Sequence, residues 1–234
     1  MRFINDRRCL QEPCRHAVLA GAMLLVAACA PQAKSYYPLD VGRSWTYAMS
    51  IQPASGQAVR VSSEVTNLPE RRVAGQTVTP QATEALDQRR LRFIRADESG
   101  VAEIADQDGN AAEPQIKRLP NTILKMPLTV GAVWKTTWET NQFGQRTLLP
   151  VTKRVESTAR PCTAGTTTFH DCLHLRLTGS GPVRADDRSA TVDVAGEEWF
   201  VPALGYVRGL FAESVRGLPQ NDVRVEVTLT DSTP

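Results

Sequence analysis

Apolar and polar residues alternate along much of this chain. From position 45 to position 52 the odd-numbered residues are apolar, and the even-numbered ones, apart from Ala48, are polar. Near the C-terminus, Val223, Val225, Val227 and Leu229 repeat the alternation. A period of two with aromatic and β-branched residues is typical of a strand with one buried face. No segment keeps an apolar period of 3.6 residues, so we predict a predominantly antiparallel β fold.

Turn-forming residues divide the chain into further short strands. Residues 53–56 read Pro-Ala-Ser-Gly and connect the first strand to a second at 59–65, as in a hairpin. We expect a helix of one or two turns at 81–90, an extended loop at 114–120, and a bulge or turn beginning at Gly196. Other strands are expected at 72–79, 91–95, 101–105, 147–157, 173–177, 192–194, 198–201 and 206–211.

The N-terminal residues have the pattern of a signal peptide. Residues 1–16 carry Arg2, Arg7, Arg8 and Arg15, and residues 17–28 are uncharged and rich in Leu, Val and Ala. This apolar run is shorter than the roughly 20 residues that a membrane-spanning helix needs. Its length and basic flank are typical of a secretory leader. We therefore predict a signal peptide over 1–28.

The end of this run resembles the lipobox of bacterial lipoproteins, because small residues lead directly into a cysteine at Val26-Ala27-Ala28-Cys29. In that family the thiol receives a diacylglycerol, the chain is cut before the cysteine, and the new amine is acylated, with palmitate for example. The resemblance implies lipidation of Cys29, a tether over 29–35 and attachment to a membrane. Ala30 follows in place of Asp, which in Gram-negative lipoproteins implies the outer membrane, on its periplasmic face. The alternatives are an ordinary secretory signal with an incidental cysteine, and a retained, uncleaved anchor.

Cleavage before Cys29 changes the charge balance. The chain of 234 residues has 27 Lys and Arg against 25 Asp and Glu, and the leader holds four of the former and two of the latter. The remaining 206 residues therefore carry 23 basic and 23 acidic side chains. They lack the basic excess expected of a nucleic-acid binder. Their number suits a single β-rich domain over 36–234.

One motif occurs twice: residues 38–45 and 127–134 share the pattern P-L-x-V-G-x-x-W. The proline fixes φ, the glycine permits a turn with positive φ, and the tryptophan anchors the strand that follows. The repeat predicts two similar strand entrances. Either two related halves meet near 120–127, or one turn recurs without duplication.

Three segments resemble a group of poorly characterised bacterial envelope lipoproteins. Its Y-x-P-L-x-x-G-x-x-W-x-Y segment is matched over 36–47 with one extra tyrosine, and its W-[FY]-x-P-x-x-G-x-V-[RK] segment over 199–208. Residues 164–172 are similar to its A-G-T-F-x-x-C, with two residues inserted before Phe169, and Ala203 stands where its C-terminal turn usually has glycine. The resemblance implies a strongly curved antiparallel sheet or incomplete β-barrel with few short helices. Periplasmic carriers of lipids or lipoproteins have a similar shape, which suggests a groove for an apolar ligand.

Two cysteines remain once Cys29 is lipidated. Cys162 and Cys172 lie on either side of a turn signal, and in an oxidising compartment such a pair forms a disulfide by default. The alternative is a metal site, because alternation places His170, Cys172 and His174 on one strand face, where with Cys162 they make a Cys₂His₂ set for Zn²⁺. The other face of that strand is expected to carry Phe169, Leu173, Leu175 and Leu177.

The sequence offers little support for catalysis. His170 and His174 are the histidines left after cleavage, and neither lies in a G-x-S-x-G or H-E-x-x-H setting. We therefore predict a non-enzymatic envelope lipoprotein, a binding or structural module that holds an apolar ligand or a protein partner, without cofactor, catalytic residue or metal. The alternative is a metal-dependent or hydrolytic envelope protein that uses His170, Cys172 and His174.

Overall fold

The computed structural model describes residues 36–185 and 188–234. The predicted signal peptide (1–28), the lipidation site Cys29 and the rest of the tether (30–35) lie outside the described residues. The strands are β1 (Ser44–Pro53), β2 (Val59–Asn67), β3 (Arg71–Val73), β4 (Gln76–Ala85), β5 (Gln88–Asp97), β6 (Gly100–Asp108), β7 (Gln115–Lys125), β8 (Val133–Thr140), β9 (Thr147–Ala164), β10 (Thr167–Ala185), β11 (Arg188–Val201), β12 (Gly205–Val215) and β13 (Val223–Thr233). Two 3₁₀ turns, η1 (Gln142–Gly144) and η2 (Pro219–Asn221), complete the described elements. Within this part of the chain, no helix has the length and hydropathy needed to cross a membrane.

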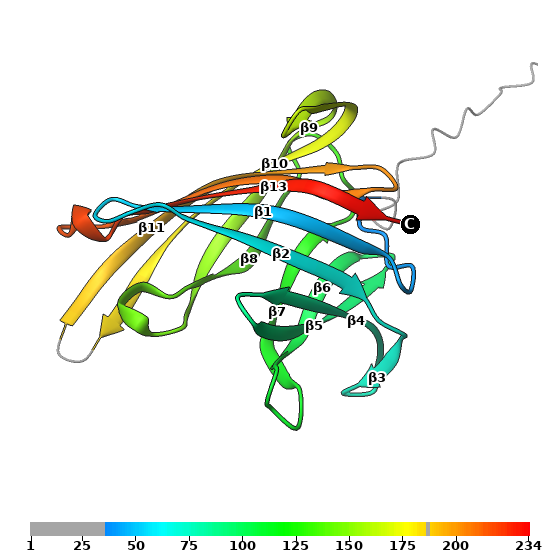
Figure 1. The fold of residues 1–234 in the computed structure, drawn as a ribbon, viewed down its shortest axis with the longest axis horizontal. Coiled ribbons are helices and arrows are strands. Elements are labelled where there is room, and N and C mark those ends of the chain that lie inside the picture. Colours follow the sequence, from blue (N-terminus) through cyan, green and yellow to red (C-terminus); the bar gives the residue numbers. More distant parts are fainter. Residues whose placement is uncertain (1–35, 186–187) are drawn as a thin grey trace, which may run out of the picture.

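The strands form one antiparallel sheet. They are hydrogen-bonded in the order β7-β6-β5-β4-β2-β1-β13-β12-β11-β10-β9-β8, and β3 pairs with β4. Apart from β3, which branches from β4, strands that are neighbours in the sheet are also consecutive in the chain. The strands β1 to β7 therefore form an N-terminal meander, and β8 to β13 form a C-terminal one. The exception is β1 with β13, which lie side by side in Figure 1 and join the N-terminal meander to the C-terminal one. The prediction of a mainly β fold, a strongly curved antiparallel sheet or incomplete barrel, is confirmed.

The sheet curves until its end strands, β7 and β8, almost meet. No strand pairing joins these two strands in the described ranges. Side chains connect them instead: the Trp134 indole donates to the carbonyl oxygen of Thr122 at 3.2 Å, and the Thr136 hydroxyl donates to Oδ1 of Asn121 at 2.7 Å. The fold is therefore a nearly closed barrel with one seam, between β7 and β8, that side chains hold.

The two copies of the repeated motif make the same turn. Gly42 and Gly131 have φ angles of 84° and 86°. The Gly42 amide donates to the carbonyl oxygen of Asn67 at 2.9 Å, and the Gly131 amide donates to that of Val155 at 2.8 Å. Each turn leads into a buried tryptophan, at the start of β1 and of β8. The motif thus opens each of the two meanders in the same way.

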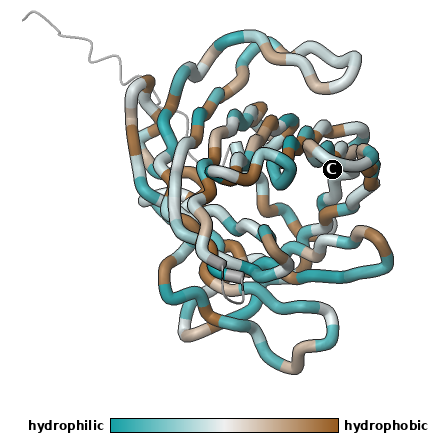
Figure 2. Tube along the Cα trace, turned by 90° about the vertical axis from the view of Figure 1, so that its left-hand side faces the viewer, coloured by the Kyte–Doolittle hydropathy of each residue, from teal (hydrophilic) through white to brown (hydrophobic). Residues whose placement is uncertain are grey.

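Apolar side chains are buried on both faces of the sheet. The largest cluster includes Ile94, Leu124, Trp134, Leu175 and Phe200, which come from strands far apart in the sheet order. Strands so distant can share one cluster only because the sheet curls around it, as the trace does in Figure 2. Smaller clusters surround Phe93 in the N-terminal meander and the cysteine pair in the C-terminal one.

The helix expected at 81–90 is wrong. β4 continues to Ala85, Leu86 and Asp87 form a turn with φ of 49° and 59°, and β5 begins at Gln88. An isolated helical turn gains little from its few hydrogen bonds, whereas pairing of β4 with β5 and β2 satisfies the backbone along the segment. The turn lacks the usual Asn-Gly or Asp-Gly signal.

Three other expectations also need correction. Residues 115–120 belong to β7 and are not a loop, and residues 72–79 form a hairpin of β3 and β4 rather than one strand. Gly196 starts neither a bulge nor a turn, because it lies within β11, paired with Phe211 and Leu177. Its role is close packing: a Cβ there would lie 2.5 Å from Cδ1 of Phe211. The register shift of β11 comes later, between Trp199 and Phe200.

Candidate functional site

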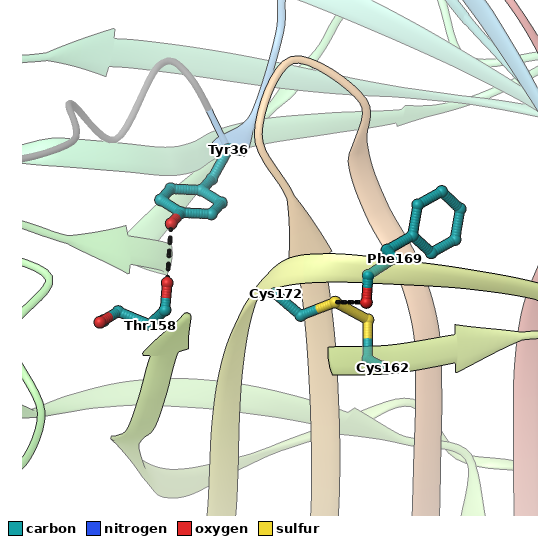
Figure 3. Close-up of a disulfide and its surroundings, with 5 residues drawn as sticks. All are labelled: Tyr36, Thr158, Cys162, Phe169 and Cys172. Carbon is teal, nitrogen blue, oxygen red and sulfur yellow. Dashed lines mark hydrogen bonds between the residues drawn. A yellow bond between two sulfur atoms is a disulfide. The ribbon is translucent and has the colours of Figure 1, made fainter. Parts of the chain in front are cut away.

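Cys162 and Cys172 are joined by a disulfide, with their Cα atoms 6.0 Å apart. Figure 3 shows the bond beside the carbonyl group of Phe169, and both cysteines are buried. They form the centre of an apolar cluster with Ala164 and Val207, against which Trp199, Leu204 and Leu229 pack. The bond therefore joins β9 to β10 near the turn of their hairpin, and the apolar cluster packs this end of the hairpin against β11, β12 and β13.

The proposed metal ligands do not assemble. His170 is exposed, Cys172 is bonded to Cys162, and the His174 ring stacks on the Trp199 ring at 4.8 Å. A register shift between Phe169 and Cys172 adds a residue to β10 and breaks the simple alternation there. Phe169 accordingly packs against the disulfide cluster and not with the leucines of β10. Among the described residues, no group of three His, Cys, Asp or Glu side chains is placed to hold a metal ion.

A cavity of about 410 Å³ lies inside the curve of the sheet. Strands from both meanders line it, and the N-terminal segment closes part of it. The lining residues are Tyr37, Pro38, Trp45, Tyr47, Met49, Ser63, Val65, Gln81, Thr83, Arg90, Arg92, Asn121, Ile123, Lys153, Glu198, Phe200, Gly205, Tyr206 and Val227. This volume falls in the range of small-molecule sites, roughly 300–1,000 Å³.

The aromatic side chains of the cavity are held by their polar ends. The Trp45 indole donates to the carbonyl oxygen of Leu204 at 2.7 Å, and the Tyr47 hydroxyl donates to that of Tyr206 at 3.0 Å. The Tyr206 ring lies 5.8 Å from the Tyr47 ring and 5.4 Å from the Phe200 ring. These anchors fix the rings, so the surface they present to the cavity is apolar and rigid.

A glycine makes room for Tyr206. A Cβ at Gly209 would lie 1.8 Å from the Tyr206 hydroxyl oxygen and 2.5 Å from Cε2 of Phe211. Any larger residue at position 209 would therefore displace the ring of Tyr206 from the cavity wall. This glycine positions the site although it does not line the cavity.

Charged residues form another part of the wall. Nε of Arg92 donates to Oε2 of Glu103 at 2.9 Å, and Nζ of Lys117 lies 3.0 Å from Oε1 of the same carboxylate. Burial alone raises the pKa of the Glu103 carboxyl, but the charges of Arg92 and Lys117 outweigh it, and that pKa lies below its ordinary value. A separate pair, Lys153 and Glu198, is 2.6 Å apart.

A second ionic cluster bridges the seam. Arg90 of β5 and Arg146, which follows η1, each bind the carboxylates of Asp106 on β6 and Glu139 on β8. Burial is the largest influence on the pKa of Asp106 and raises it, but hydrogen bonds from Arg146 and Arg90 prevail and lower it. The pKa of Glu139 is lowered in the same way, by Arg90 and Arg146 against burial. Both acids are therefore ionised at neutral pH.

The tyrosines of the cavity are neutral. Burial raises the pKa of Tyr37, and burial likewise raises that of Tyr206. The Tyr37 hydroxyl donates to Oε1 of Gln81 at 2.7 Å, and the Gln81 amide donates to Oδ1 of Asn67 at 2.8 Å. This chain of hydrogen bonds fixes the N-terminal segment over the cavity, because Asn67 in turn donates to the carbonyl oxygen of Pro38 at 3.2 Å.

The sequence patterns did not indicate this cavity. Arg90 ends the segment expected to be helical, whereas Arg92, Lys153 and Glu198 lie in expected strands whose patterns do not mark them as lining a cavity. One signal was available: Trp45, Tyr47 and Met49 fall on the predicted buried face of the first strand, and these residues do line the cavity.

No protein-family model matches the chain, and no curated protein sequence matches it. Two solved structures are similar in shape. A protein of Bacteroides fragilis, provisionally described as exported and with a YmcC-like fold, has a TM-score of 0.46 at 10% identity, over 86% of this chain and 99% of that one. A protein of Parabacteroides distasonis, provisionally described as a lipoprotein, has a TM-score of 0.40 at 11% identity, over 85% and 98%. Similarity at this level carries no information about ligand or activity, which depend on the residues of the site.

Proposed function

We propose that this chain is a non-enzymatic lipoprotein of the cell envelope that holds a ligand with an apolar part in the cavity of its curved sheet. The observation that carries the proposal is the cavity itself, with its wall of anchored aromatic rings. Ligand sites are typically concave, mostly apolar and preformed, with a few polar groups. This cavity is concave and preformed, and most of its surface is apolar.

The N-terminal sequence supports a place at a membrane. Lipidation of Cys29 would tether the domain through residues 29–35, on the periplasmic face of the outer membrane in a Gram-negative cell. Two or more acyl chains hold a protein firmly to a bilayer, at about 0.8 kcal/mol per buried CH₂. A tethered domain with an apolar cavity is suited to take up molecules that partition between the bilayer and the periplasm.

The test uses a fluorescent probe that responds to apolar sites, N-phenyl-1-naphthylamine. Every strand pairing of the described residues lies between Ser44 and Thr233, so the chain is produced without residues 1–28 and with Cys29→Ser. We expect saturable binding of one probe per chain. Val65→Trp, which fills the cavity from β2, is expected to weaken binding at least tenfold.

The matched control is Glu64→Trp, which places the same side chain on the adjacent, outward-facing position of β2. It is expected to bind the probe like the unsubstituted chain. Absence of saturable binding, or equal binding by the two tryptophan variants, would contradict the proposal and leave a structural or partner-binding role without an internal ligand.

A further inference from the structure

The cavity has two chemically different walls. The apolar wall comes from β1, β13, β12 and β11, which are consecutive in the sheet, and its apolar residues are Trp45, Tyr47, Met49, Val227, Tyr206 and Phe200. Glu198 of β11 also lines the cavity, where it pairs with Lys153. The more polar wall comes from β2, β4, β5 and β7, and its polar residues are Ser63, Gln81, Thr83, Arg90, Arg92 and Asn121, beside the apolar Val65 and Ile123. A molecule that matches both walls has an apolar body and a polar end.

The charge on the polar wall is positive at the cavity surface. Arg92 has 32% of its side chain exposed, whereas its partner Glu103 has 5%. Arg90 has 33% exposed against 7% for Asp106. Both arginines line the cavity, and neither of these acids does. Glu103 therefore neutralises the Arg92 guanidinium from behind, while part of the Arg92 side chain is accessible from the cavity. The terminal nitrogens of Arg90, in contrast, are already bound to Asp106 and Glu139.

Arg92 has donors to spare. It binds Glu103 through Nε, so its two terminal nitrogens are not used in that bond. A guanidinium presents its N–H groups in a planar fork that matches a carboxylate or phosphate. The other cation of the lining, Lys153, adds no net charge, because its partner Glu198 also lines the cavity.

We infer that the ligand is an amphiphile with an acidic head group, a carboxylate or a phosphate, bound by Arg92 while its apolar part lies on the wall around Trp45 and Tyr47. This inference rests on the proposed function, because it assumes that the cavity holds a ligand. It places the acidic head group of the ligand beside β5 and the apolar part of the ligand beside β1 and β11–β13.

The test compares two probes that differ only in charge: cis-parinaric acid and its methyl ester. Fluorescence titrations use the same Cys29→Ser chain without residues 1–28. We expect the acid to bind at least tenfold more tightly than the ester. In Arg92→Gln this preference should fall to less than threefold, because the acid loses its ion pair and the ester has none to lose. Glu103 keeps Lys117 as its partner in this variant.

The control is Arg95→Gln, on the same strand and similarly exposed, but outside the cavity lining; it should keep the preference for the acid. Far-UV circular dichroism reports whether each variant is folded, and the comparison of acid and ester on the unsubstituted chain decides the question even if Arg92→Gln does not fold. Equal affinity for acid and ester would overturn the acidic head group while leaving the proposed function standing. Failure of both probes and of N-phenyl-1-naphthylamine would overturn both.

A free anion is distinguished from an amphiphile by competition. Inorganic phosphate at 10-fold molar excess over the acid probe is expected to leave its binding unchanged, because phosphate gains nothing from the apolar wall. Displacement of the probe at that concentration would show that Arg92 selects a small anion, which would contradict the assignment to an amphiphile.

Discussion

The Arg90 guanidinium on β5 donates two hydrogen bonds to the Glu139 carboxylate on β8, at 3.2 and 3.0 Å, although these strands do not pair. The contact crosses the seam where the sheet fails to close. At the other end of the seam, Trp134 and Thr136 reach β7 through neutral hydrogen bonds. Closure of the sheet therefore depends on a few side chains, one group of which is ionic.

We predict that Glu139→Gln destabilises the protein by about 1–2 kcal/mol, because it weakens two charge-assisted contacts that are only partly exposed. The measurement is urea unfolding at pH 7. Glu84→Gln is the control: the Glu84–Arg89 pair is 3.6 Å apart and largely exposed, so its loss should cost less than about 0.5 kcal/mol. Equal costs for the two substitutions would mean that the ionic cluster contributes nothing to closing the seam.

The stability of the folded protein should fall in acid, because three carboxylates stabilise the fold in their ionised form. Glu103, Asp106 and Glu139 all have a pKa below the ordinary value in the folded protein. A lowered pKa means that the folded state favours the ionised form, so the stabilisation is complete above the unfolded-state pKa of about 4. It is lost as the pH falls from there through the folded-state values. Urea midpoints measured from pH 7 to pH 2.5 should show this loss.

Asp106→Asn separates this effect from general acid denaturation. The variant should be less stable than the unsubstituted chain at pH 7, by about 3 kcal/mol, because a buried acid with cationic partners is removed. Its stability should then depend less steeply on pH below 4. Parallel curves for the two proteins would show that Asp106 does not carry the predicted share of the pH dependence.

The strands could be predicted from the sequence because their patterns are local. The cavity could not be predicted, because it results from the curvature of the whole sheet. Alternation over 45–52 located β1 and its buried face, and the repeated motif located two equivalent turns. By contrast, Arg90 and Arg92 alternate with Leu91 and Phe93 in a way that is typical of an ordinary half-buried strand. Only the closure of the sheet, with Phe93 buried in a cluster outside the cavity lining, shows that the arginines point inward.

The cysteine region shows a second limit of sequence patterns. Simple alternation places Cys172 and Leu173 on opposite faces, yet both are buried, because Cys172 lies in the disulfide cluster and Leu173 in the largest apolar cluster. A bulge adds one residue and reverses every later side chain. Nothing in residues 169–172 marks the register shift that separates His170 from Cys172 and His174. The alternative of a metal site is wrong because Cys172 is bonded to Cys162 and His174 stacks on Trp199.

The equivalent turns at Gly42 and Gly131 should respond equally to substitution. Each glycine has a positive φ and open space where a Cβ would be, so an alanine introduces backbone strain and no clash. We predict a cost of about 1–2 kcal/mol for Gly42→Ala and for Gly131→Ala, measured by urea unfolding. Asparagine tolerates this conformation better, so Gly→Asn at either position should recover part of the loss. Costs that differ by more than about 1 kcal/mol would contradict the equivalence of the two turns.

Removal of the disulfide should loosen one end of the β9–β10 hairpin. Cys162 and Cys172 are separated by 10 positions, and closure of a loop of about this size contributes roughly 3 kcal/mol in the chain-entropy model. The variant Cys162→Ala with Cys172→Ala should lose about 2–3 kcal/mol in urea unfolding. Reductant should produce a similar loss in the unsubstituted chain and none in the variant. Reactive thiols at both positions before reduction would instead contradict the disulfide.

The predicted lipidation of Cys29 can be tested in cells, because it determines where the protein is located. Cells that express the full chain and are given radiolabelled palmitate should incorporate label into it, and the protein should sediment with the envelope. Cys29→Ser should incorporate none and should appear in the soluble periplasmic fraction, because the chain then lacks the acyl chains that hold it to the bilayer. Cys9→Ser is the matched control, since it lies in the predicted leader and should change neither result. If Cys29→Ser still remains with the membrane, residues 17–28 act as an uncleaved anchor, and the chain is held by its leader instead of by fatty acids.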